Sequence, residues 1–384
     1  MATRQHMFMN TFLLVNTLVW YFLVFTVLRS LIENANLSHV DVLIIWALNI
    51  VASAASALSS TEIASLLRRR VTFVFIWLFI GFLSSLAPLF INSTVISLYF
   101  ISIIYGVSFG LGMPISMEYF SEATTVENRG RFGGISFFSF ALLVFLLSVM
   151  STGNFVGEVL ISAAWRGIGF LALFLVKPIE ITLNKKVPSY ISILGERAFI
   201  FYIVPWTMFC LVNYITIPIT CNFFGEDFVR LSSVVENFII AVFALVSGFL
   251  SDIFGRKRLS IAGFVMLGLG YAMLGIYPGV IFSWYFYTVV DGIAWGILYA
   301  IFLIVLWGDI AYDRSSGKFY ALGGLPFILA YFVQIMAGYY IAEVVSVYTI
   351  FSLASFFLFL AVIPLMYAPE TLPEKARRER ELKS

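Results

Sequence analysis

Four ionisable side chains fall inside long apolar runs of the sequence. Asp291 lies about half-way along one run, and Trp295 follows one helical turn later on the same face. Glu236 occupies a second run, while Arg166 and Arg29 are bases in two others. A charged side chain in an apolar interior is costly unless it is protonated, paired or hydrated. These side chains are therefore the first candidates for chemistry.

Each candidate supports more than one use. The acid beside an aromatic ring, Asp291, could bind a cation, hydrogen-bond a hydroxyl group or relay a proton, and Glu236 is a second candidate proton site. Arg166 and Arg29 could receive an anionic group or pair with those acids. Arg29 and Glu33 are four residues apart, so they could instead pair with each other at the outer rim. Two uncharged candidates, which could equally be interhelical contacts, are Tyr105 and Asn213.

The composition identifies the environment of these residues. Hydrophobic residues make up 61% of the chain and charged residues only 11%, whereas soluble proteins carry about 25% charged residues. The apolar runs are about 20 residues long, which suits membrane-spanning helices; barrel strands would be about 10 residues and alternating. We therefore predict an all-α integral membrane protein.

We predict twelve spans with the amino terminus inside. All but three of the Lys and Arg residues then fall in cytoplasmic segments, as the positive-inside rule requires, and both termini are cytoplasmic. The three exceptions are Arg29, Arg166 and Arg230. The spans are expected at 8–30, 40–66, 71–91, 94–118, 132–150, 159–177, 198–221, 230–250, 259–277, 280–306, 319–342 and 345–367.

The two halves of the chain resemble each other. Tyr105–Gly110 matches Asp291–Gly296 at an offset of 186 residues, and the bases Arg68–Arg70 match Arg256–Arg258 at an offset of 188. Matches that occur in the same order and at nearly the same offset favour a duplicated six-helix unit. The predicted division is an N-terminal bundle at 1–178, a cytoplasmic linker at 179–197, a C-terminal bundle at 198–367 and a cytoplasmic tail at 368–384.

One loop carries a family resemblance. Residues 248–258 read Gly-Phe-Leu-Ser-Asp-Ile-Phe-Gly-Arg-Lys-Arg, and the spacing Gly-x3-Asp-x2-Gly-Arg-Lys resembles the cytoplasmic loop signature of the major facilitator superfamily. The resemblance implies the major facilitator fold, two six-helix bundles with a solute site between them. It also implies that these residues latch the cytoplasmic side without touching substrate. The implied gate residues are Gly248, Asp252, Gly255, Arg256 and Lys257.

Two further patches resemble sugar-porter-like members of that superfamily. Glu122 precedes Arg129-Gly130 by seven residues, and Pro369-Glu370-Thr371 follows the last span. We expect Glu122 and Arg129 to pair across a turn or to bridge to a neighbouring helix end, as part of the gate.

The sequence also departs from the family pattern. The first-half loop at 61–70 keeps its bases but lacks the Asp and the Gly, so either the latch is one-sided or Glu62 substitutes. The Gln residues typical of sugar porters are missing: Phe137 stands at one such position, and the seventh span has Asn213 instead. A sugar is therefore only one candidate substrate.

These observations predict a secondary transporter that moves a small polar organic solute, such as a sugar, an organic acid or a related metabolite, by alternating access. Proton symport is the favoured coupling, with Asp291 or Glu236 as the proton carrier, and facilitated diffusion stays open. The alternatives are a non-transporting receptor or assembly protein with the same fold and a multidrug or solute exporter.

The chain shows no sequence pattern of an enzyme. It has no His-Glu-x-x-His and no phosphate-binding Gly-rich loop, and its two cysteines, Cys210 and Cys221, are expected to be small apolar side chains. We expect no cofactor, no metal site and no nucleic-acid partner. The expected partners are a solute, a proton and the lipid bilayer, for a monomer in the plasma membrane.

Overall fold

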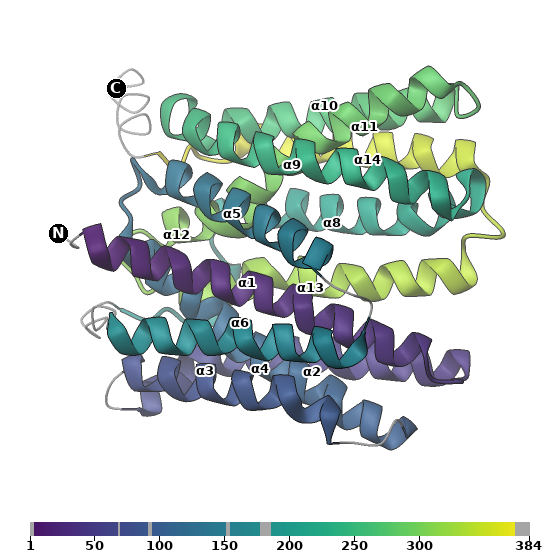
Figure 1. Cartoon of the computed structure of the whole chain (residues 1–384). Coiled ribbons are helices and arrows are strands. Elements are labelled where there is room, and N and C mark those ends of the chain that lie inside the picture. The colour runs from purple at the N-terminus through teal and green to yellow at the C-terminus, as the bar shows by residue number, and fades with distance from the viewer. Residues whose placement is uncertain (1–3, 68–69, 91–93, 151–153, 177–185, 373–384) are drawn as a thin grey trace, which may run out of the picture. The chain divides into compact units, whose positions relative to one another are not determined.

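The computed structural model describes residues 4–67, 70–90, 94–150, 154–176 and 186–372, and these residues are almost entirely helical (Figure 1). Among them, twelve helices are long and apolar enough to cross a membrane. The prediction of a twelve-span, all-α membrane protein is therefore confirmed. Several predicted cytoplasmic bases, Arg68, Arg69, Lys177, Lys185 and those after residue 372, lie outside the described residues.

The chain divides into two compact units. Unit 1 comprises Met1–Thr124, Ser139–Val187 and Asp313–Leu322, and unit 2 comprises Thr125–Phe138, Pro188–Tyr312 and Gly323–Ser384. The predicted boundaries of the two bundles stay a prediction. The predicted linker lies partly outside the described residues, and its described end contains a short helix, α7 (Tyr190–Leu194).

Unit 1 is built from long helices that lie side by side, with α2 and α6 packing on α4 and α3 respectively. Its helices are α1 (Arg4–Glu33), α2 (His39–Leu66), α3 (Arg70–Leu86), the short η1 (Ala87–Leu89), α4 (Val95–Ala123), the later part of α5 (Arg129–Met150), α6 (Phe155–Leu175) and the first turns of α13 (Gly317–Tyr340).

Unit 2 has the same character, with α10 packing on α14 and α9 on α11. It contains the first turns of α5, the rest of α13, and the helices α7, α8 (Arg197–Phe224), α9 (Glu226–Phe254), α10 (Arg256–Ile276), α11 (Ile281–Leu298), α12 (Leu306–Ala311) and α14 (Val347–Tyr367). The residues Tyr299–Val305 between α11 and α12 form a π-helical stretch, so the tenth span runs continuously from Ile281 to Ala311.

Glycines set close helix contacts in both units. A Cβ atom at Gly296 would lie 2.7 Å from the carbonyl oxygen of Ile240, so α11 presses directly on the backbone of α9. In unit 1, a Cβ at Gly106 would collide with the carbonyl of Asn49, which brings α4 equally close to α2. Small residues one turn apart allow such an approach in membrane proteins. The matched sequence motifs therefore bring two helices into close contact in each unit.

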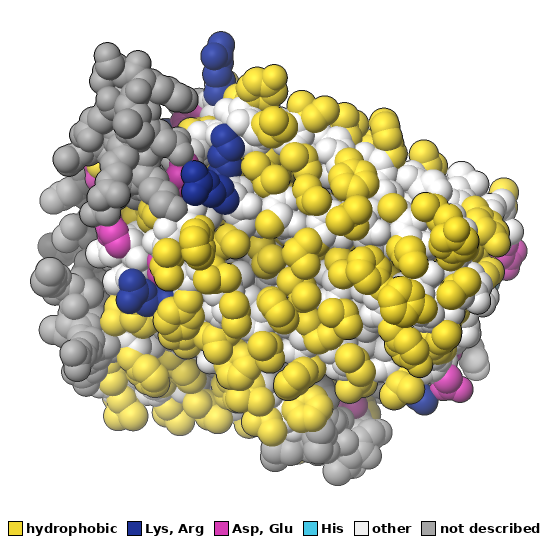
Figure 2. Space-filling model, turned by 90° about the horizontal axis from the view of Figure 1, so that it is seen from above, with side chains coloured by type: hydrophobic (Ala, Val, Ile, Leu, Met, Phe, Trp, Pro, Cys, Tyr) yellow, Lys and Arg dark blue, Asp and Glu magenta, His cyan; other side chains and the backbone are white. Residues whose placement is uncertain are grey.

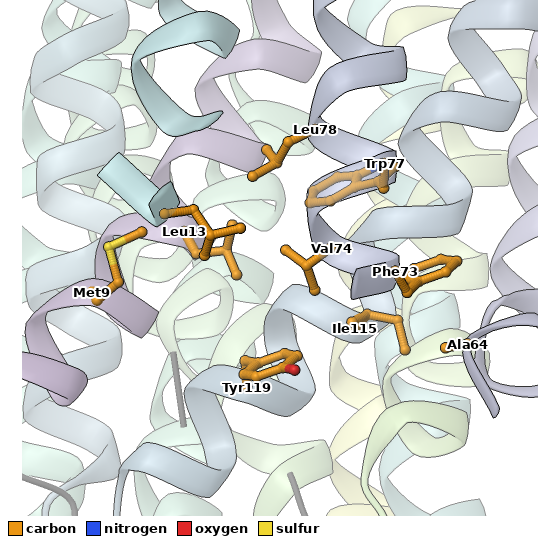
Figure 3. Close-up of a cluster of buried hydrophobic side chains, with 10 residues drawn as sticks. Met9, Leu13, Ala64, Phe73, Val74, Trp77, Leu78, Ile115 and Tyr119 are labelled. Atoms are coloured by element: carbon orange, nitrogen blue, oxygen red, sulfur yellow. The ribbon is translucent and has the colours of Figure 1, made fainter. Parts of the chain in front are cut away.

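The core of unit 1 is apolar and tightly packed. Figure 3 shows Met9 and Leu13 facing Val74 and Trp77, with Tyr119 below them. These side chains come from α1, α3 and α4, and none of the five exposes more than 3% of its surface. The cluster therefore joins α1 to the consecutive helices α3 and α4.

The surface is apolar as well. Figure 2 shows hydrophobic side chains spread across the visible face, with few Lys and Arg side chains among them. Phe79, Phe100, Phe174 and Phe238 each expose at least 48% of their surface. A soluble monomer rarely exposes so much contiguous apolar area, whereas lipid tails would cover it.

Candidate functional site

Two acids meet inside unit 2. Glu236 on α9 and Asp291 on α11 are joined by a hydrogen bond between their carboxyl groups. Asp291 is only 1% exposed, and Glu236 is partly buried. Gly292 explains how they meet, because a Cβ there would lie 2.8 Å from the side chain of Ile239 and would hold the two helices apart. Ionised carboxylates only accept hydrogen bonds, so a hydrogen bond between these two groups requires a proton on one of them.

A chain of hydrogen bonds leads away from the acid pair across three helices. Asp291 is hydrogen-bonded to Tyr287. The Tyr287 hydroxyl donates to the Tyr271 hydroxyl at 3.2 Å, and Tyr271 donates to Oδ1 of Asn213 at 3.0 Å. The hydroxyl groups of Tyr271 and Thr216 also lie 2.8 Å apart. Consecutive hydroxyl groups of this kind are able to pass protons and to bind polar solutes.

Aromatic rings cover the other side of Asp291. Nε1 of Trp295 donates to Oδ1 of Asp291 at 3.0 Å, which fixes the indole ring. The ring centroids of Tyr299, Phe209 and Tyr214 lie 4.8, 4.9 and 6.2 Å from that of Trp295. The structure therefore brings together four of the predicted residues, Asp291, Trp295, Glu236 and Asn213.

A second cluster in unit 2 is built on a buried acid. Asp309 on α12 accepts a hydrogen bond from Nε of Arg256 at 2.9 Å and forms an ion pair with Arg129. Arg256 is fully buried and also lies 3.1 Å from Asp252. Arg129 at the start of α5 thus contacts α12, and the predicted role of Glu122 and Arg129 in a gate stays a prediction.

Glu370, directly after α14, closes the start of α10. Its Oε1 accepts a hydrogen bond from the backbone N–H of Arg256 at 2.9 Å, and its Oε2 accepts one from that of Lys257 at 3.2 Å. A carboxylate at a helix N-terminus is favoured by the helix dipole. Gly255 makes room for it, because its φ is +95° and a Cβ would collide with Glu370. The Arg256 turn and the start of the tail therefore lie at the same end of unit 2.

Asp252 binds the backbone at the start of α5 in the way that Glu370 binds the start of α10. Its two carboxylate oxygens accept the backbone N–H groups of Gly130 and Arg131, each at 2.9 Å. Gly248 lets the helices meet, since a Cβ there would lie 2.5 Å from the carbonyl of Gly130 and 2.8 Å from Cα of Gly134. The residues of the loop signature thus hold the first turns of α5 by backbone contacts.

Unit 1 contains a matching cluster around Glu118 on α4. Glu118 accepts a hydrogen bond from Nη1 of Arg70 at 2.7 Å and another from the Ser315 hydroxyl. Both ionised side chains are at least 97% buried. Ser315 lies two residues before the first residue of α13, so a buried acid again anchors the start of a long helix.

Glu62 completes the likeness between the clusters. Its Oε1 lies 2.5 Å from Nζ of Lys318 on the first turn of α13. Asp252 likewise binds the first turn of α5. Glu62 therefore makes a contact in unit 1, and whether it substitutes for the missing Asp in a latch stays a prediction.

The other predicted residues lie elsewhere. Arg29 forms an exposed ion pair with Glu33 at 2.7 Å. Tyr105 is buried, and its hydroxyl has no hydrogen-bond partner among the described residues. Glu122 is partly buried near the end of α4. Arg166 is fully buried in unit 1, where it lies against two tryptophan rings.

The sequence did not single out Glu118, Asp309, Tyr271 or Tyr287. Glu118 ends one predicted span and Asp309 lies three residues after the corresponding one, at an offset of 191 residues that is close to that of the other repeats, and this was the available signal. Tyrosine is common in this chain, with 19 copies, so nothing distinguished the two hydroxyl groups beside Asp291. Among the described residues, no group of His, Cys, Asp and Glu is arranged to hold a metal ion.

Comparison with known proteins places the fold. No family model matches the chain. No curated protein matches it in sequence either. Among solved structures it is similar to the human organic anion transporter MFSD10 (TETRAN), with a TM-score of 0.69 and 14% identity over 94% of this chain and 99% of that one. It is also similar to the proton:xylose symporter XylE of the major facilitator superfamily, bound to 6-bromo-6-deoxy-D-glucose. That match has a TM-score of 0.70 and 16% identity over 96% of this chain and 97% of the other.

Proposed function

We propose that this chain, which has the major facilitator fold, is a secondary transporter that moves a small polar organic solute by alternating access. The observation that carries the proposal is the meeting of two carboxyl groups, those of Glu236 and Asp291, where α9 and α11 approach closely inside a span-rich unit. Ionisable groups at this depth cost free energy, and in membrane proteins they mark ion and substrate pathways.

Proton coupling follows from the chemistry of the pair. Two carboxyl groups that share a proton can release it and take it up again as a unit, because like charges at hydrogen-bonding distance resist joint ionisation. The hydroxyl chain through Tyr287 and Tyr271 supplies a route or a set of hydrogen-bond partners next to the pair. Proton symport is therefore the proposed mode, with facilitated diffusion as the simpler alternative.

The solute class is proposed more broadly. Of the two similar structures, one is named for organic anions and the other for a proton and xylose. Both descriptions fit a polar organic solute, and they differ in its charge. Trp295 and Tyr299 offer ring faces beside polar groups, which suits the mixed surface of a sugar, an organic acid or a related metabolite.

The two charged clusters are the proposed gate. In unit 2, Asp252, Arg256 and Asp309 hold the start of α5, and in unit 1, Glu62 and Glu118 hold the start of α13. Their buried ion pairs have the arrangement expected of contacts that break and re-form as a whole. The proposed setting is the plasma membrane, with a monomer whose termini are both cytoplasmic.

The alternative class is a receptor or assembly protein that kept the fold and lost transport. Its main support was the missing Asp in the first-half loop. The ion pair between Glu62 and Lys318 weakens that support, because the contact exists with a different residue. A multidrug or solute exporter differs from the proposal in direction and substrate range.

Flux across proteoliposomes tests the function directly. Purified protein would be reconstituted and supplied with labelled sugars, organic acids and amines, with and without an inward proton gradient. We expect accumulation of one class that collapses when an ionophore removes the gradient. Flux of one class that is indifferent to the gradient would replace symport by facilitated diffusion. No flux of any class would contradict transport.

A further inference from the structure

We infer that Asn213 is a positioning residue for the acid pair. Acting through Tyr271 and Tyr287, it sets the direction of the hydrogen bond at Asp291 and keeps a proton on that carboxyl group. The side chains lie within unit 2 and come from three helices, α8, α10 and α11. Asn213, Tyr271 and Asp291 each expose only 1% of their surface, so their hydrogen-bond partners must come from the protein.

The amide of Asn213 has a fixed orientation. Its Nδ2 donates to the backbone carbonyl of Phe209, one turn earlier on α8, at 2.8 Å. A carbonyl oxygen only accepts, so the nitrogen of the amide faces it and Oδ1 faces the Tyr271 hydroxyl at 3.0 Å. Oδ1 has no proton of its own, and Tyr271 is therefore the donor in this contact.

This end point sets the direction of the whole hydroxyl chain. A tyrosine hydroxyl has one proton, and Tyr271 uses its proton towards Asn213. The proton between the two tyrosines is therefore that of Tyr287, which is the direction of this 3.2 Å hydrogen bond in the structure. The oxygen of Tyr287 can then only accept from Asp291. A carboxyl group donates only when it is protonated, so Asp291 carries a proton.

Thr216 is a second neighbour of Tyr271, with the two hydroxyl oxygens 2.8 Å apart, and either group could donate in this contact. A donation from Tyr271 to Thr216 would leave Oδ1 of Asn213 buried without a donor, which costs the free energy of a hydrogen bond. With Thr216 as the donor, Tyr271 accepts two hydrogen bonds and donates one, which is the full capacity of a hydroxyl group.

Glu236 carries the second proton of the pair. The proton of Asp291 points to Tyr287, so the hydrogen bond between the two carboxyl groups needs a proton on Glu236. The pair is then uncharged, which suits an apolar interior. When Asp291 releases its proton, the two groups share the one that is left.

The titratable groups that face Asp291 come from three helices and the π-helical stretch. They are Glu236 on α9, Tyr271 on α10, Tyr287 on α11 and Tyr299 in the stretch after it. Among the described residues, neither acid of the pair forms an ion pair with a base. Tyrosine hydroxyl groups keep their protons at neutral pH, so the two acids are the groups that titrate.

Ionisation of Asp291 reverses the demand on the chain. A carboxylate only accepts, so Tyr287 must turn its proton towards it. Either Tyr271 then turns to Tyr287 and leaves Asn213 without a donor, or the contact between the two tyrosines holds no proton. Each arrangement loses one buried hydrogen bond, and the amide on α8 thereby holds the proton on α11.

The device also bears on transport. If the proposed function holds, a movement of α8 away from α10 separates Asn213 from Tyr271, removes this penalty and eases release of the proton; this step rests on the proposed function. The protonation of Asp291 does not rest on it, because it is measured without transport.

Infrared spectroscopy of the purified full chain in detergent tests the inference, because the carbonyl stretch of a protonated carboxyl group disappears on ionisation. The two bands are assigned by their loss in Asp291→Asn and in Glu236→Gln. We expect both bands at neutral pH, and titration to higher pH gives the midpoint at which the Asp291 band is lost. A spectrum without an Asp291 band at neutral pH would overturn the inference.

Asn213→Leu removes the acceptor at nearly unchanged volume, so ionisation of Asp291 no longer leaves a buried amide oxygen without a donor. The midpoint should fall by about one to two pH units, the equivalent of one buried hydrogen bond. Thr220→Val is the matched control, because it removes a polar group two turns further along α8, where the hydroxyl donates to the backbone carbonyl of Thr216 at 2.9 Å. The control should keep the wild-type midpoint, and an equal midpoint in Asn213→Leu would overturn the inference.

Tyr287→Phe decides whether Asn213 acts through the hydroxyl chain. Without the Tyr287 hydroxyl, the amide has no route to Asp291, so adding Asn213→Leu to Tyr287→Phe should not move the midpoint further. If Asn213 acted by packing alone, it would shift the midpoint equally in both backgrounds, and that result would overturn the inference. Tyr271→Phe gives the same test at the other hydroxyl if Tyr287→Phe does not fold.

The outcomes separate the two proposals. A midpoint that falls as expected, together with no flux of any solute in proteoliposomes, would contradict the proposed function and leave the role of Asn213 standing. Proton-driven flux with an unshifted midpoint in Asn213→Leu would overturn the role of Asn213 and leave the proposed function standing.

Discussion

Nε of Arg256 lies 2.9 Å from Oδ2 of Asp309, and the other oxygen of the same carboxylate holds Arg129. One buried acid thus contacts two buried bases that are 127 positions apart in the sequence, and Asp252 also pairs with Arg256. Removing such an acid leaves uncompensated charge in the interior.

Asp309→Asn should therefore destabilise the protein strongly. Breaking a buried ion pair by removing one partner costs about 3–5 kcal/mol. Denaturant or thermal unfolding in detergent would measure the loss. Asp313→Asn is the matched control, because Asp313 is exposed and should change stability by less than about 0.5 kcal/mol. Equal stability of the two variants would contradict a charge-balancing role for Asp309.

Asp291→Asn should abolish proton-driven accumulation and leave solute counterflow intact. Glu236→Gln should have the same effect, because the two carboxyl groups form one proton site. Uptake and counterflow in proteoliposomes separate the two activities. Unchanged accumulation in either variant would remove that residue from the coupling mechanism.

Gly255→Ala should destabilise unit 2 by about 1–3 kcal/mol, because a φ of +95° with an extended ψ is strained for any side chain. The added methyl group would also displace Glu370 from the start of α10. Gly279→Ala is the control, since a Cβ at that position would have no neighbouring group within 4 Å. Unfolding midpoints of the two variants compare them directly, and a smaller loss at 255 than at 279 would contradict the argument.

Asp252→Asn should slow turnover without changing solute affinity. The carboxylate accepts two backbone N–H groups at the start of α5, and an amide offers only one acceptor oxygen in its place. Measured kcat should fall while the dissociation constant stays the same. Turnover at the wild-type rate would show that this contact does not gate the transporter.

The ion pair of Glu62 and Lys318 should tolerate exchange of its charges. Glu62→Lys and Lys318→Glu should each slow turnover, and the double variant should recover most of it, since the pair is restored in reverse. Glu62 is about half exposed, so stability should change by less than about 1 kcal/mol in each case. Additive losses in the double variant would mean that the two side chains act independently.

The membrane spans and the importance of the signature loop could be predicted from the sequence. Uninterrupted apolar runs of about 20 residues leave few alternatives to a membrane helix. The two glycines that follow Asp291, and the acid Asp252, belong to short motifs that are recognised from the spacing of neighbouring residues. The structure places both motifs at close helix contacts.

The contacts within the side-chain clusters could not be predicted from the sequence, for a physical reason. Asp309 contacts Arg129, which is 180 positions away in the sequence, and Tyr271 is hydrogen-bonded to Asn213, which is 58 positions away. No local sequence pattern predicts either contact. Arg166 was visible as a base in an apolar run. That its neighbours are aromatic rings and an amide, with no acid among the described residues beside it, depends on the packing of α1, α3 and α6.

The π-helical stretch Tyr299–Val305 gives the tenth span a surplus residue relative to an α-helix of the same pitch. If the same residues followed an α-helical pitch, the surplus residue would turn everything downstream by about 100°, and Asp309 would point away from Arg256 while Asp291 kept its place. An ungapped alignment of this span with an uninterrupted helix therefore matches one acid and misregisters the other, so relatives of this chain are best aligned in two segments that meet within the stretch.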